Sequence, residues 1–511
     1  MREGERACSE ASWDFVAFHA AARPERLAAT DLASGSRWTC RGLDDRIARC
    51  VTVLAARGVR QGDRVGVLAR NSVDVIVVQF ACTRLGAIAT ILNWRLKAAE
   101  LSVILADAAP ALLIADAACA ELQAESAGAI PGLALDVLRA SLAEAAPAPR
   151  RPIDLDAPSI MLYTSGTSGT PKGVLLSERN AYYTGANFCL TSQIDRHSAL
   201  LCDAPLFHVI GLVIGLRACL YQGAAILISD SFDPMVTNAR LADPALAVTH
   251  YFCVPQMAAA LRSVPNFDPA KLAGLTSMTV GGAASDPEAV IQWLDDGVAY
   301  TNGYGMTEIG STAGMPLDIG VIRGRPAAVG IVPPTQQVRA VDADGHEVPA
   351  GTPGELWVRG PNVCLGYWNR PDETARAFAP GGWFRTGDIG VFDAAGYLTL
   401  VDRKKDMFIS GGENVYPAEV EAALLAHPAV REAAVVGVAD DRWGEVGCAF
   451  LIIDGEATPG ALRDHCAARI AGYKVPRHFV AATAFPRTGS GKTLKHVLRA
   501  EFAAGRHQPL S

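Results

Sequence analysis

The sequence predicts an α/β protein, with a large N-terminal domain of parallel-sheet lobes plus a small β-rich module, followed by a small α+β C-terminal domain. Three observations support this fold class. Short apolar runs alternate with helical periods up to about residue 320, turn-linked short strands follow, and the pattern changes again after about residue 402. The chain has 511 residues, which is long enough for several domains.

Strand-length apolar runs recur through the first part of the chain. The clearest lie at residues 64–69, 111–116, 224–229, 247–253, 276–281 and 297–304. Amphipathic segments such as 71–85 and 287–294 separate most of them. This alternation is typical of mostly parallel sheets covered by helices, whose ligands lie in the loops at the strand ends. A Pro/Ala/Arg-rich stretch at 145–152 predicts a linker between two lobes.

The later segments predict two further units. Short strands at 338–342, 354–359, 388–392 and 396–401, joined by Asp/Gly-rich turns, indicate a β-rich module over about residues 320–402. After it, Pro417 is placed to start a helix that Pro428 ends, and a strand at 431–438 and a helix at 461–470 follow. We therefore expect an N-terminal domain over residues 1–402 and a C-terminal domain over residues 403–511.

Composition excludes several classes of protein. Half of the residues are apolar and 19% are charged, which excludes disorder, and a net charge of −7 gives no polycation for nucleic acid or anionic lipid. Residues 1–15 lack the apolar core of a signal peptide, and the most apolar stretch, 209–228, contains Arg217 and Gln222, which favours a buried helix and strand over a membrane span. Twelve scattered cysteines without a Cys-x-x-Cys pair predict small core residues in a reducing compartment, hence a soluble cytoplasmic protein.

The strongest local signal is the segment 163–173, which reads Tyr-Thr-Ser-Gly-Thr-Ser-Gly-Thr-Pro-Lys-Gly between apolar strands at 159–163 and 174–176. Glycines let the backbone approach a ligand, successive N–H groups form a concavity for anions, and five hydroxyls and Lys172 add donors and charge. This set suits a polyphosphate, whereas a surface hairpin rarely needs five hydroxyls. It is not a Walker A loop, because Pro171 precedes Lys172, and residues 489–493 are rejected because Pro486 stands where that motif needs glycine.

Three weaker motifs follow predicted strands. Residues 304–308 place a carboxylic acid beside a hydroxyl group, which is a suitable arrangement for Mg²⁺ that bridges phosphate oxygens. The segment 281–285, Gly-Gly-Ala-Ala-Ser, would admit a flat ring or would equally form a tight turn. Asp388, after Thr386 and Gly387, offers a carboxylate for two ribose hydroxyls, although an Asp after Gly is often only part of a turn.

Together with three further segments, these motifs resemble the acyl-adenylate-forming family, in its branch of acyl-CoA synthetases and aryl-CoA ligases. The resemblance covers about residues 12–500 and rests on seven segments in order, namely 163–173, 205–211, 304–308, 386–388, 402–406, 411–417 and 486–492. It implies a large N-terminal domain, a hinge and a small mobile C-terminal domain.

The resemblance also implies a role for each matching residue. The phosphate loop, residues 164–172, would bind the β- and γ-phosphates through Thr164, Ser165, Gly166, Thr167, Ser168, Gly169, Thr170 and Lys172. Adenine would lie between Gly281, Gly282, Ala283, Asn302, Gly303, Tyr304 and Gly305. Thr307 would contact the α-phosphate, and Glu308 would hold Mg²⁺ together with Thr167. Ribose would bind Asp388 and Arg403.

The implied roles in the C-terminal part concern motion. Asp402 would be the hinge, and Lys492 would neutralise charge as the carboxylate attacks the α-phosphorus. After pyrophosphate leaves, rotation about Asp402 would withdraw Lys492 and present a loop with Gly411 and Gly412 that lines a channel for pantetheine.

The same resemblance places an acyl pocket at His208, Ile210, Gly211, Ile214, Phe252, Cys253, Val280, Gly281, Gly282 and Met306. Nearly all of these residues are apolar, which favours an apolar aliphatic or aromatic tail. None of these positions carries an Arg or Lys that could bind a second carboxylate, or an acidic residue that could bind an α-amine. Dicarboxylates and amino acids are therefore disfavoured as substrates. His208 is either a gate or a packed histidine.

We therefore expect an ATP-dependent carboxylate–CoA ligase that uses ATP, Mg²⁺ and coenzyme A. The acid and ATP would give acyl-AMP and pyrophosphate, and the CoA thiol would then displace AMP. Two alternatives stay open, an adenylating enzyme that serves a carrier-protein thiol or another nucleophile, and a non-catalytic nucleotide-binding relative. The expected partners are the three small molecules, without nucleic acid or a membrane span, and a homodimer is left open.

Overall fold

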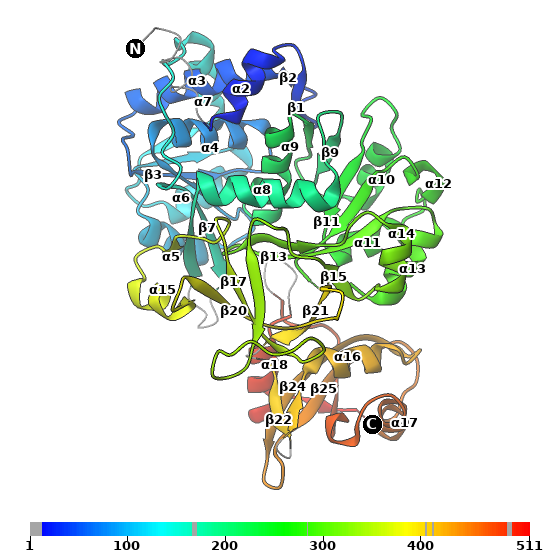
Figure 1. The fold of residues 1–511 in the computed structure, drawn as a ribbon. Coiled ribbons are helices and arrows are strands. Elements are labelled where there is room, and N and C mark those ends of the chain that lie inside the picture. The colour runs from blue at the N-terminus through cyan, green and yellow to red at the C-terminus, as the bar shows by residue number, and fades with distance from the viewer. Residues whose placement is uncertain are drawn as a thin grey trace. The chain divides into compact units, whose positions relative to one another are not determined.

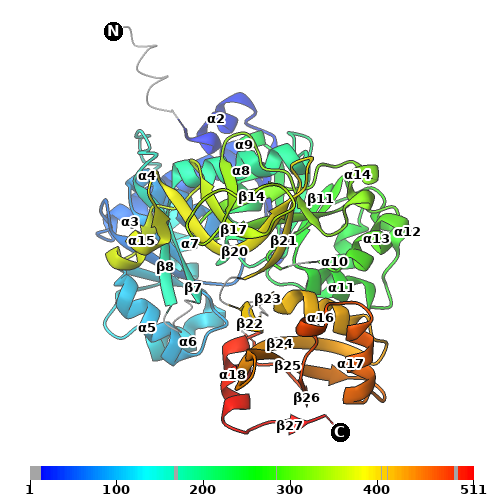
Figure 2. The ribbon, with the colours of Figure 1, turned by 60° about the horizontal axis from the view of Figure 1, so that its bottom comes forward.

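The computed structural model describes residues 13–165, 171–283, 285–403, 406–410, 413–487 and 493–510. The chain forms two compact units (Figures 1 and 2). Unit 1 comprises Met1–Val338 and Val358–Phe384, and unit 2 comprises Arg339–Trp357 and Arg385–Ser511.

Unit 1 contains a seven-stranded sheet in the order β18-β8-β7-β4-β3-β5-β6. Its strands are β3 (Arg64–Leu68), β4 (Ile88–Ile91), β5 (Leu112–Ala115), β6 (Gly132–Ala134), β7 (Pro158–Ser165), β8 (Pro171–Ser177) and β18 (Gly366–Tyr367). Strands β3 to β7 pair in parallel, whereas β8 runs antiparallel to both β7 and β18. The associated helices are α4 (Val73–Leu85), α5 (Ala98–Ala108), α6 (Ala120–Ser126) and α7 (Leu135–Glu144).

The second sheet of unit 1 has eight strands in the order β14-β13-β12-β11-β9-β10-β1-β2. They are β1 (Leu27–Asp31), β2 (Arg37–Thr39), β9 (Ala199–Cys202), β10 (Ala225–Ile228), β11 (His250–Cys253), β12 (Ser277–Val280), β13 (Tyr300–Met306) and β14 (Gly310–Gly314). The six inner strands are parallel, and β2 and β14 are antiparallel edges. Around them lie α2 (Phe15–Ala22), α3 (Cys40–Ala56), α9 (Leu216–Gln222), α10 (Pro234–Leu241), α11 (Pro255–Arg262), α12 (Pro269–Leu272), α13 (Pro287–Asp295) and α14 (Ile319–Gly324).

Two helices contact strands of both sheets in unit 1. Helix α4 touches β4, β7 and β1, and α8 (Glu178–Ser192) touches β7, β8 and β14. Figure 1 shows α8 lying across this part of the molecule next to α9. Ser177 starts α8 because its hydroxyl accepts the N–H of Asn180, which satisfies one of the unpaired donors of the first turn. In α4 nearly every residue is buried, so the segment shows little amphipathic pattern.

The structure contradicts the predicted linker between two lobes at residues 145–152. The strands on either side of it, β6 and β7, belong to the same sheet, while β1 and β2 at the start of the chain pair with the other sheet. The segment also packs on α3, where Ala148 N–H donates to Ala48 O at 3.0 Å. Composition marked an irregular segment correctly, but it carries no information about which sheet the next strand joins.

Unit 2 holds β21 (Leu398–Arg403) and most of β16 (Gln337–Val341), β17 (Gly354–Arg359) and β20 (Trp383–Phe392), in the order β21-β20-β17-β16. Its C-terminal part is built on β24 (Val430–Asp440) and β25 (Gly444–Ile453), an antiparallel pair, with β26 (His478–Ala481) parallel to β25. Short strands β22 (Phe408–Ser410), β23 (Glu413–Val415) and β27 (Gln508–Pro509) complete the sheet.

This C-terminal sheet has an apolar core on each face, because side chains alternate along β24. Val435 packs with α16 (Pro417–Leu425) and α17 (Pro459–Ala467), whereas Ala434 and Val436 pack with Leu498 of α18 (Lys495–Ala503). Figure 2 shows these three helices around the sheet.

The predicted fold class is confirmed: parallel-sheet lobes, a β-rich module and an α+β C-terminal part. The domain boundary expected after residue 402 stays a prediction. The eleven described cysteines are all buried and unpaired with one another, which confirms their interpretation as core residues. Over the described part of the chain, the helices are too short or too polar for any of them to span a bilayer.

Candidate active site

The phosphate loop lies between two strands of an antiparallel hairpin. Strands β7 and β8 place Thr164 opposite Lys172 and Tyr163 opposite Gly173, so the strands predicted on both sides of the loop are confirmed. Residues 166–170, and with them Gly166, Thr167, Ser168, Gly169 and Thr170, lie outside the described residues, as does the side chain of Ser165. The hairpin therefore fixes both ends of the loop and places Lys172 at its exit.

Two side chains of the segment 367–373 surround the ammonium group of Lys172. Its Nζ contacts the carboxylate of Glu373, on α15 (Pro371–Ala377), and lies 5.5 Å from the ring centroid of Tyr367. Only 18% of the Lys172 side chain is exposed. Reduced hydration strengthens the attraction between this cation and an anionic ligand.

Thr307 and Glu308 lie in the turn between β13 and β14. Two glycines make this turn possible, since a Cβ on Gly305 would collide with the carbonyl of Gly310 and a Cβ on Gly310 would collide with Thr184 of α8. Gly310 also has φ +57°, which side chains disfavour. The turn is thereby pressed against α8, with Glu308 only 6% exposed.

Glu308 is held by Tyr367. The Tyr367 hydroxyl donates to Oε1 of Glu308 at 3.0 Å. Burial and the neighbouring Glu308 carboxylate raise the pKa of Tyr367, so its hydroxyl stays protonated and acts as the donor. A buried carboxylate beside the hydroxyl-bearing Thr307 is a set of hard oxygen ligands, which fits Mg²⁺.

The residues expected around adenine come together at the ends of two neighbouring strands. Val280, the last residue of β12, pairs with Asn302 of β13, and Gly281 to Ala283 follow β12 directly. A Cβ on Gly281 would lie 3.4 Å from the carbonyl oxygen of Gly303 and 3.3 Å from the Phe252 ring. The Asn302 amide is engaged by backbone, because Nδ2 donates to Pro326 O at 3.0 Å. Tyr304 is buried, while Gly282 and Ala283 are exposed.

Most of the residues expected in the acyl pocket gather beside these strand ends. Ile210, Gly211 and Ile214 lie in a π-helix, η2 (Ile210–Gly215), and a Cβ on Gly282 would lie 3.4 Å from the Ile210 side chain. Gly211 allows η2 to approach the preceding loop, since a Cβ there would lie 2.7 Å from Pro205 O.

Strands β11, β12 and β13 supply Phe252, Val280 and Met306. The Phe252 ring stacks on Phe188 of α8, with centroids 5.1 Å apart. Cys253, by contrast, follows Phe252 along a strand and so points to the opposite face, near the buried carboxyl of Asp203.

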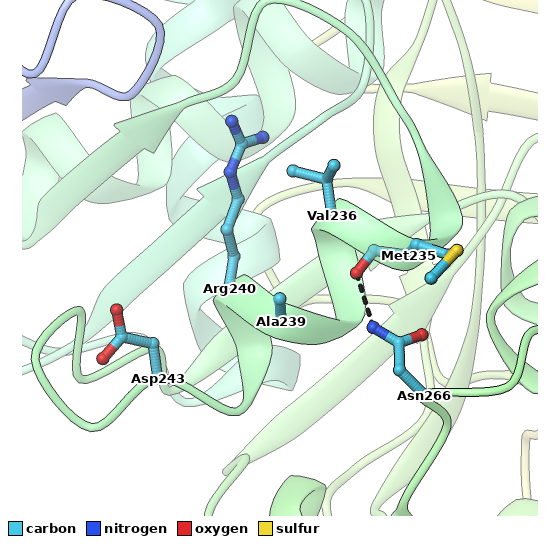
Figure 3. Close-up of a pocket in the computed structure, with 6 residues that line it drawn as sticks. All are labelled: Met235, Val236, Ala239, Arg240, Asp243 and Asn266. Atoms are coloured by element: carbon cyan, nitrogen blue, oxygen red, sulfur yellow. Dashed lines mark hydrogen bonds between the residues drawn. The ribbon is translucent and has the colours of Figure 1, made fainter.

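His208 packs on a neighbouring aromatic residue, and a separate surface hollow lies in the same unit. The His208 ring packs on Phe207 with centroids 4.6 Å apart, and its backbone N–H donates to Pro205 O. A hollow of about 440 Å³ is lined by none of the expected site residues, and its lining residues are drawn in Figure 3. It is lined by Met235, Val236, Ala239, Arg240, Asp243 and Asn266.

In unit 2, the residues expected at ribose and at the hinge share one pair of strands. Asp388 of β20 is paired with Arg403 of β21, and Ile389 with Asp402. The backbone N–H of Asp388 donates to the Thr386 hydroxyl at 3.0 Å across Gly387, whose φ is +70°. Asp388 is 8% exposed, and the side chain of Arg403 is outside the described residues. Gly411, Gly412 and Lys492 also lie outside the described residues, although a bridge between Arg487 and Thr493 closes the loop that carries Lys492.

Comparison with known proteins identifies the family. Residues 16–368 match the AMP-binding enzymes, and residues 419–492 match the AMP-binding enzyme C-terminal domain. The chain belongs to the AMP-binding enzyme family.

Relatives within this family are CoA ligases. Feruloyl-CoA synthase of Amycolatopsis sp is 37% identical over 92% of this chain and 94% of its own length. Long-chain-fatty-acid–CoA ligase FadD13 of Mycobacterium tuberculosis is 34% identical over 94% and 96%. The structure of o-succinylbenzoate CoA synthetase (MenE) from Bacillus subtilis with its acyl-adenylate intermediate, at 30% identity, superposes with a TM-score of 0.86 over 95% of this chain and 97% of that one.

This AMP-binding enzyme is therefore an ATP-dependent carboxylate–CoA ligase that forms acyl-AMP and then acyl-CoA, with ATP, Mg²⁺ and CoA as its small-molecule requirements. The two alternative functions are not favoured. Two residues of the candidate site, Tyr367 and Glu373, were not predicted from the sequence. No local pattern marks them, because β18 brings Tyr367 beside β8 from about 190 positions further along the chain.

Proposed function

We propose that this ligase activates an acid with an apolar aromatic tail, a phenylpropenoic acid such as ferulic acid being the first candidate. One observation carries the proposal: the ring of Phe252 lies stacked on Phe188 directly beside Gly281. Gly281 is expected both at adenine and in the acyl pocket. A flat aryl group packs favourably against such a ring, and it can approach the backbone at a glycine because no side chain occupies that space.

Two further observations support an apolar tail. The expected pocket residues Ile210, Ile214 and Val280 are aliphatic, and apart from His208 the set contains no ionisable side chain other than the buried thiol of Cys253. The 37% identity to a feruloyl-CoA synthase supports the aromatic class, while the relative named as a long-chain-fatty-acid ligase makes an aliphatic acid the alternative.

We assign the residues as follows. The phosphate loop with Lys172 binds the β- and γ-phosphates, Thr307 contacts the α-phosphate, and Glu308 with Thr167 holds Mg²⁺. When bound, Mg²⁺ supplies charge that stabilises the phosphate oxygens. Asp388 and Arg403 bind ribose, Gly281 to Ala283 and Asn302 to Gly305 flank adenine, and His208 borders the acid.

In the first half-reaction, a carboxylate oxygen of the acid attacks the α-phosphorus and the bond to pyrophosphate breaks, while Lys492 neutralises the developing charge. In the second, the CoA thiol gives its proton to solvent water and its sulfur attacks the acyl carbonyl carbon, whose bond to the AMP oxygen breaks, so that AMP leaves. Asp402 acts as the hinge between the two steps, and Gly411 and Gly412 line the path of pantetheine. We place the enzyme in the cytoplasm, and a homodimer stays a prediction.

The test is AMP release with ATP and Mg²⁺ over a panel of ferulic, cinnamic, benzoic and fatty acids, each with and without CoA. We expect turnover with ferulic or cinnamic acid only when CoA is present, and the thioester in the product. Turnover with fatty acids alone would move the substrate to the aliphatic class, and AMP release indifferent to CoA would contradict the thiol acceptor.

A pair of variants tests the pocket itself. Phe252→Leu should lower kcat/KM for the aryl acid about tenfold and should change kcat/KM for ATP little, because a buried aromatic contact is worth on the order of 1 kcal/mol beyond its area. Phe267→Leu is the matched control, since Phe267 also packs on an aromatic ring, that of Trp293, away from the candidate site. Equal losses in both variants would contradict a role for Phe252 in acid selection.

A further inference from the structure

We propose that Tyr367 is a positioning residue for adenylation, which aligns Glu308 through its hydroxyl and Lys172 through its ring. The inference rests on the proposed function, in which Glu308 holds Mg²⁺ and Lys172 binds phosphate. One side chain thereby touches both groups: the hydroxyl donates to Glu308 Oε1 at 3.0 Å, and the Lys172 ammonium lies 5.5 Å from the ring centroid.

The backbone of Tyr367 is fixed relative to the phosphate loop. Strand β18 pairs with β8 in antiparallel register, with Tyr367 opposite Val174, two residues after Lys172. Flanking hydrogen bonds extend this pairing, from Leu365 N–H to Leu175 O at 2.9 Å and from Trp368 N–H to Gly173 O at 2.8 Å. The position of the Tyr367 ring over Lys172 is therefore set by the strand that carries Lys172.

The same segment is fixed relative to the turn that carries Glu308. The backbone N–H of Cys364 donates to Glu308 O at 2.7 Å, and the Asn362 amide donates to Ile309 O at 2.6 Å. Tyr367 adds the contact to the Glu308 carboxylate itself. Residues 362–367 thus connect the phosphate loop to the expected metal ligand.

The two contacts suit a residue that positions charged groups without replacing their ligands. A phenol hydroxyl donates a hydrogen bond to a carboxylate and restricts its rotation, while the carboxylate remains an anion. An aromatic ring attracts an ammonium group through its quadrupole and carries no net charge. Glu373, which also contacts Lys172, does carry a charge that opposes a phosphate.

Two substitutions separate the contacts. Tyr367→Phe removes only the hydroxyl and keeps the ring, whereas Tyr367→Leu removes both. We expect Tyr367→Phe to weaken metal binding about tenfold, which corresponds to about 1.4 kcal/mol, close to the lower end of the values for a hydrogen bond to a charged group. Tyr367→Leu should in addition weaken nucleotide binding measured without metal, because the Lys172 ammonium is no longer oriented.

The measurement is Mn²⁺ binding by electron paramagnetic resonance, with the full chain and α,β-methylene-ATP, whose linkage between the α- and β-phosphorus atoms cannot be cleaved, so that no acyl-AMP forms. Tyr251→Phe is the matched control, since its buried hydroxyl also donates to a carboxylate, that of Asp203 at 3.1 Å, outside the site. Thermal denaturation confirms that each variant is folded. The expected result is a tenfold weaker Mn²⁺ affinity for Tyr367→Phe and no change for Tyr251→Phe.

Glu308→Gln distinguishes failure of this inference from failure of the proposed function. If Glu308→Gln weakens Mn²⁺ binding and Tyr367→Phe does not, the positioning role of Tyr367 is overturned while the metal assignment stands. If Glu308→Gln leaves Mn²⁺ affinity unchanged, the assignment of Glu308 is wrong and the inference falls with it. Equal losses of Mn²⁺ affinity in Tyr367→Phe and Tyr251→Phe would show that general destabilisation causes the loss, and would overturn the positioning role of Tyr367.

Discussion

The carboxylate of Asp402 accepts the backbone N–H of Ala418 at 2.8 Å, so the expected hinge residue caps helix α16. Helix α16 has no cap of its own, because the Tyr416 side chain makes no capping hydrogen bond and Pro417 has no N–H. Ala418 N–H is therefore the first donor of the helix that needs a partner, and a residue of β21 supplies it.

This relationship predicts that Asp402→Pro slows thioester formation more than adenylation. Proline removes the cap and fixes φ at the position assigned as the hinge, so the conformational change between the half-reactions is impeded. The two steps are measured separately, by pyrophosphate exchange and by CoA-dependent release of AMP from supplied acyl-AMP.

Asp402→Asn is the control for Asp402→Pro. Its amide oxygen still accepts the Ala418 N–H, and both rates should stay near those of the unchanged enzyme. Loss of the cap alone costs about 1 kcal/mol of stability, so thermal denaturation checks that the proline variant is folded. Unchanged thioester kinetics in Asp402→Pro would refute Asp402 as a hinge.

The assignment of Lys492 predicts a selective defect. Lys492→Ala should lower acyl-adenylate formation by two or more orders of magnitude, because removing a cation from developing charge costs on the order of 3 kcal/mol or more. Thioester formation from supplied acyl-AMP should remain nearly intact. Lys474→Ala is the control, since this lysine of the same unit pairs with Glu419. Equal loss of both half-reactions in Lys492→Ala would contradict the assignment.

Local signals predicted the elements well. The apolar run at 276–281 became β12 (Ser277–Val280), and the helix expected after Pro417 became α16 (Pro417–Leu425). The most apolar stretch, expected as a buried helix and a strand, is η2, α9 and β10. These patterns depend on residues close in sequence, so one sequence is enough to detect them.

Long-range pairing could not be predicted in the same way. The pairing of β18 with β8, and of β1 with β10, joins segments that are far apart along the chain. The residues of one strand do not indicate which other strand it will pair with. For this reason the candidate site was predicted without Tyr367 and Glu373. Side chains alternate along β11, so Cys253 points to the opposite face of the strand from Phe252, and its place in the acyl pocket stays a prediction.

Burial of the cysteines predicts that the folded enzyme resists thiol reagents. The thiolate is the reactive form, and burial raises the pKa of Cys50, Cys189 and Cys202 to about 12 from 9.0. At about pH 8 this shift lowers the thiolate fraction roughly a thousandfold, in addition to the steric protection of a buried side chain.

The measurement uses a chromogenic disulfide reagent on the Cys8→Ser variant, since Cys8 lies outside the described residues. We expect almost no reaction in buffer at about pH 8 and complete reaction of the remaining cysteines in guanidinium chloride. A fast stoichiometric reaction of the folded protein would contradict the burial of these thiols.

A buried ion pair between the two sheets of unit 1 predicts a large stability effect. Arg217 of α9 pairs with Glu178 of α8 at 3.0 Å, and the same carboxylate accepts the hydroxyls of Ser159 at 2.8 Å and Thr83 at 3.0 Å. Both partners are under a tenth exposed. Arg217→Met should therefore lower the free energy of unfolding by about 3–5 kcal/mol, because Glu178 is left as a buried charge without its cation.

The neighbouring residue supplies the control for Arg217→Met. Arg179 forms a comparably short pair with Asp156, at 2.6 Å, but on the surface, so Arg179→Met should change stability little. The double variant Glu178→Gln with Arg217→Met should recover part of the loss, since it removes the uncompensated charge as well as the cation. Denaturant unfolding of the three variants measures these differences. Similar losses in Arg217→Met and Arg179→Met, or no recovery in the double variant, would show that packing and not the buried charge determines the effect.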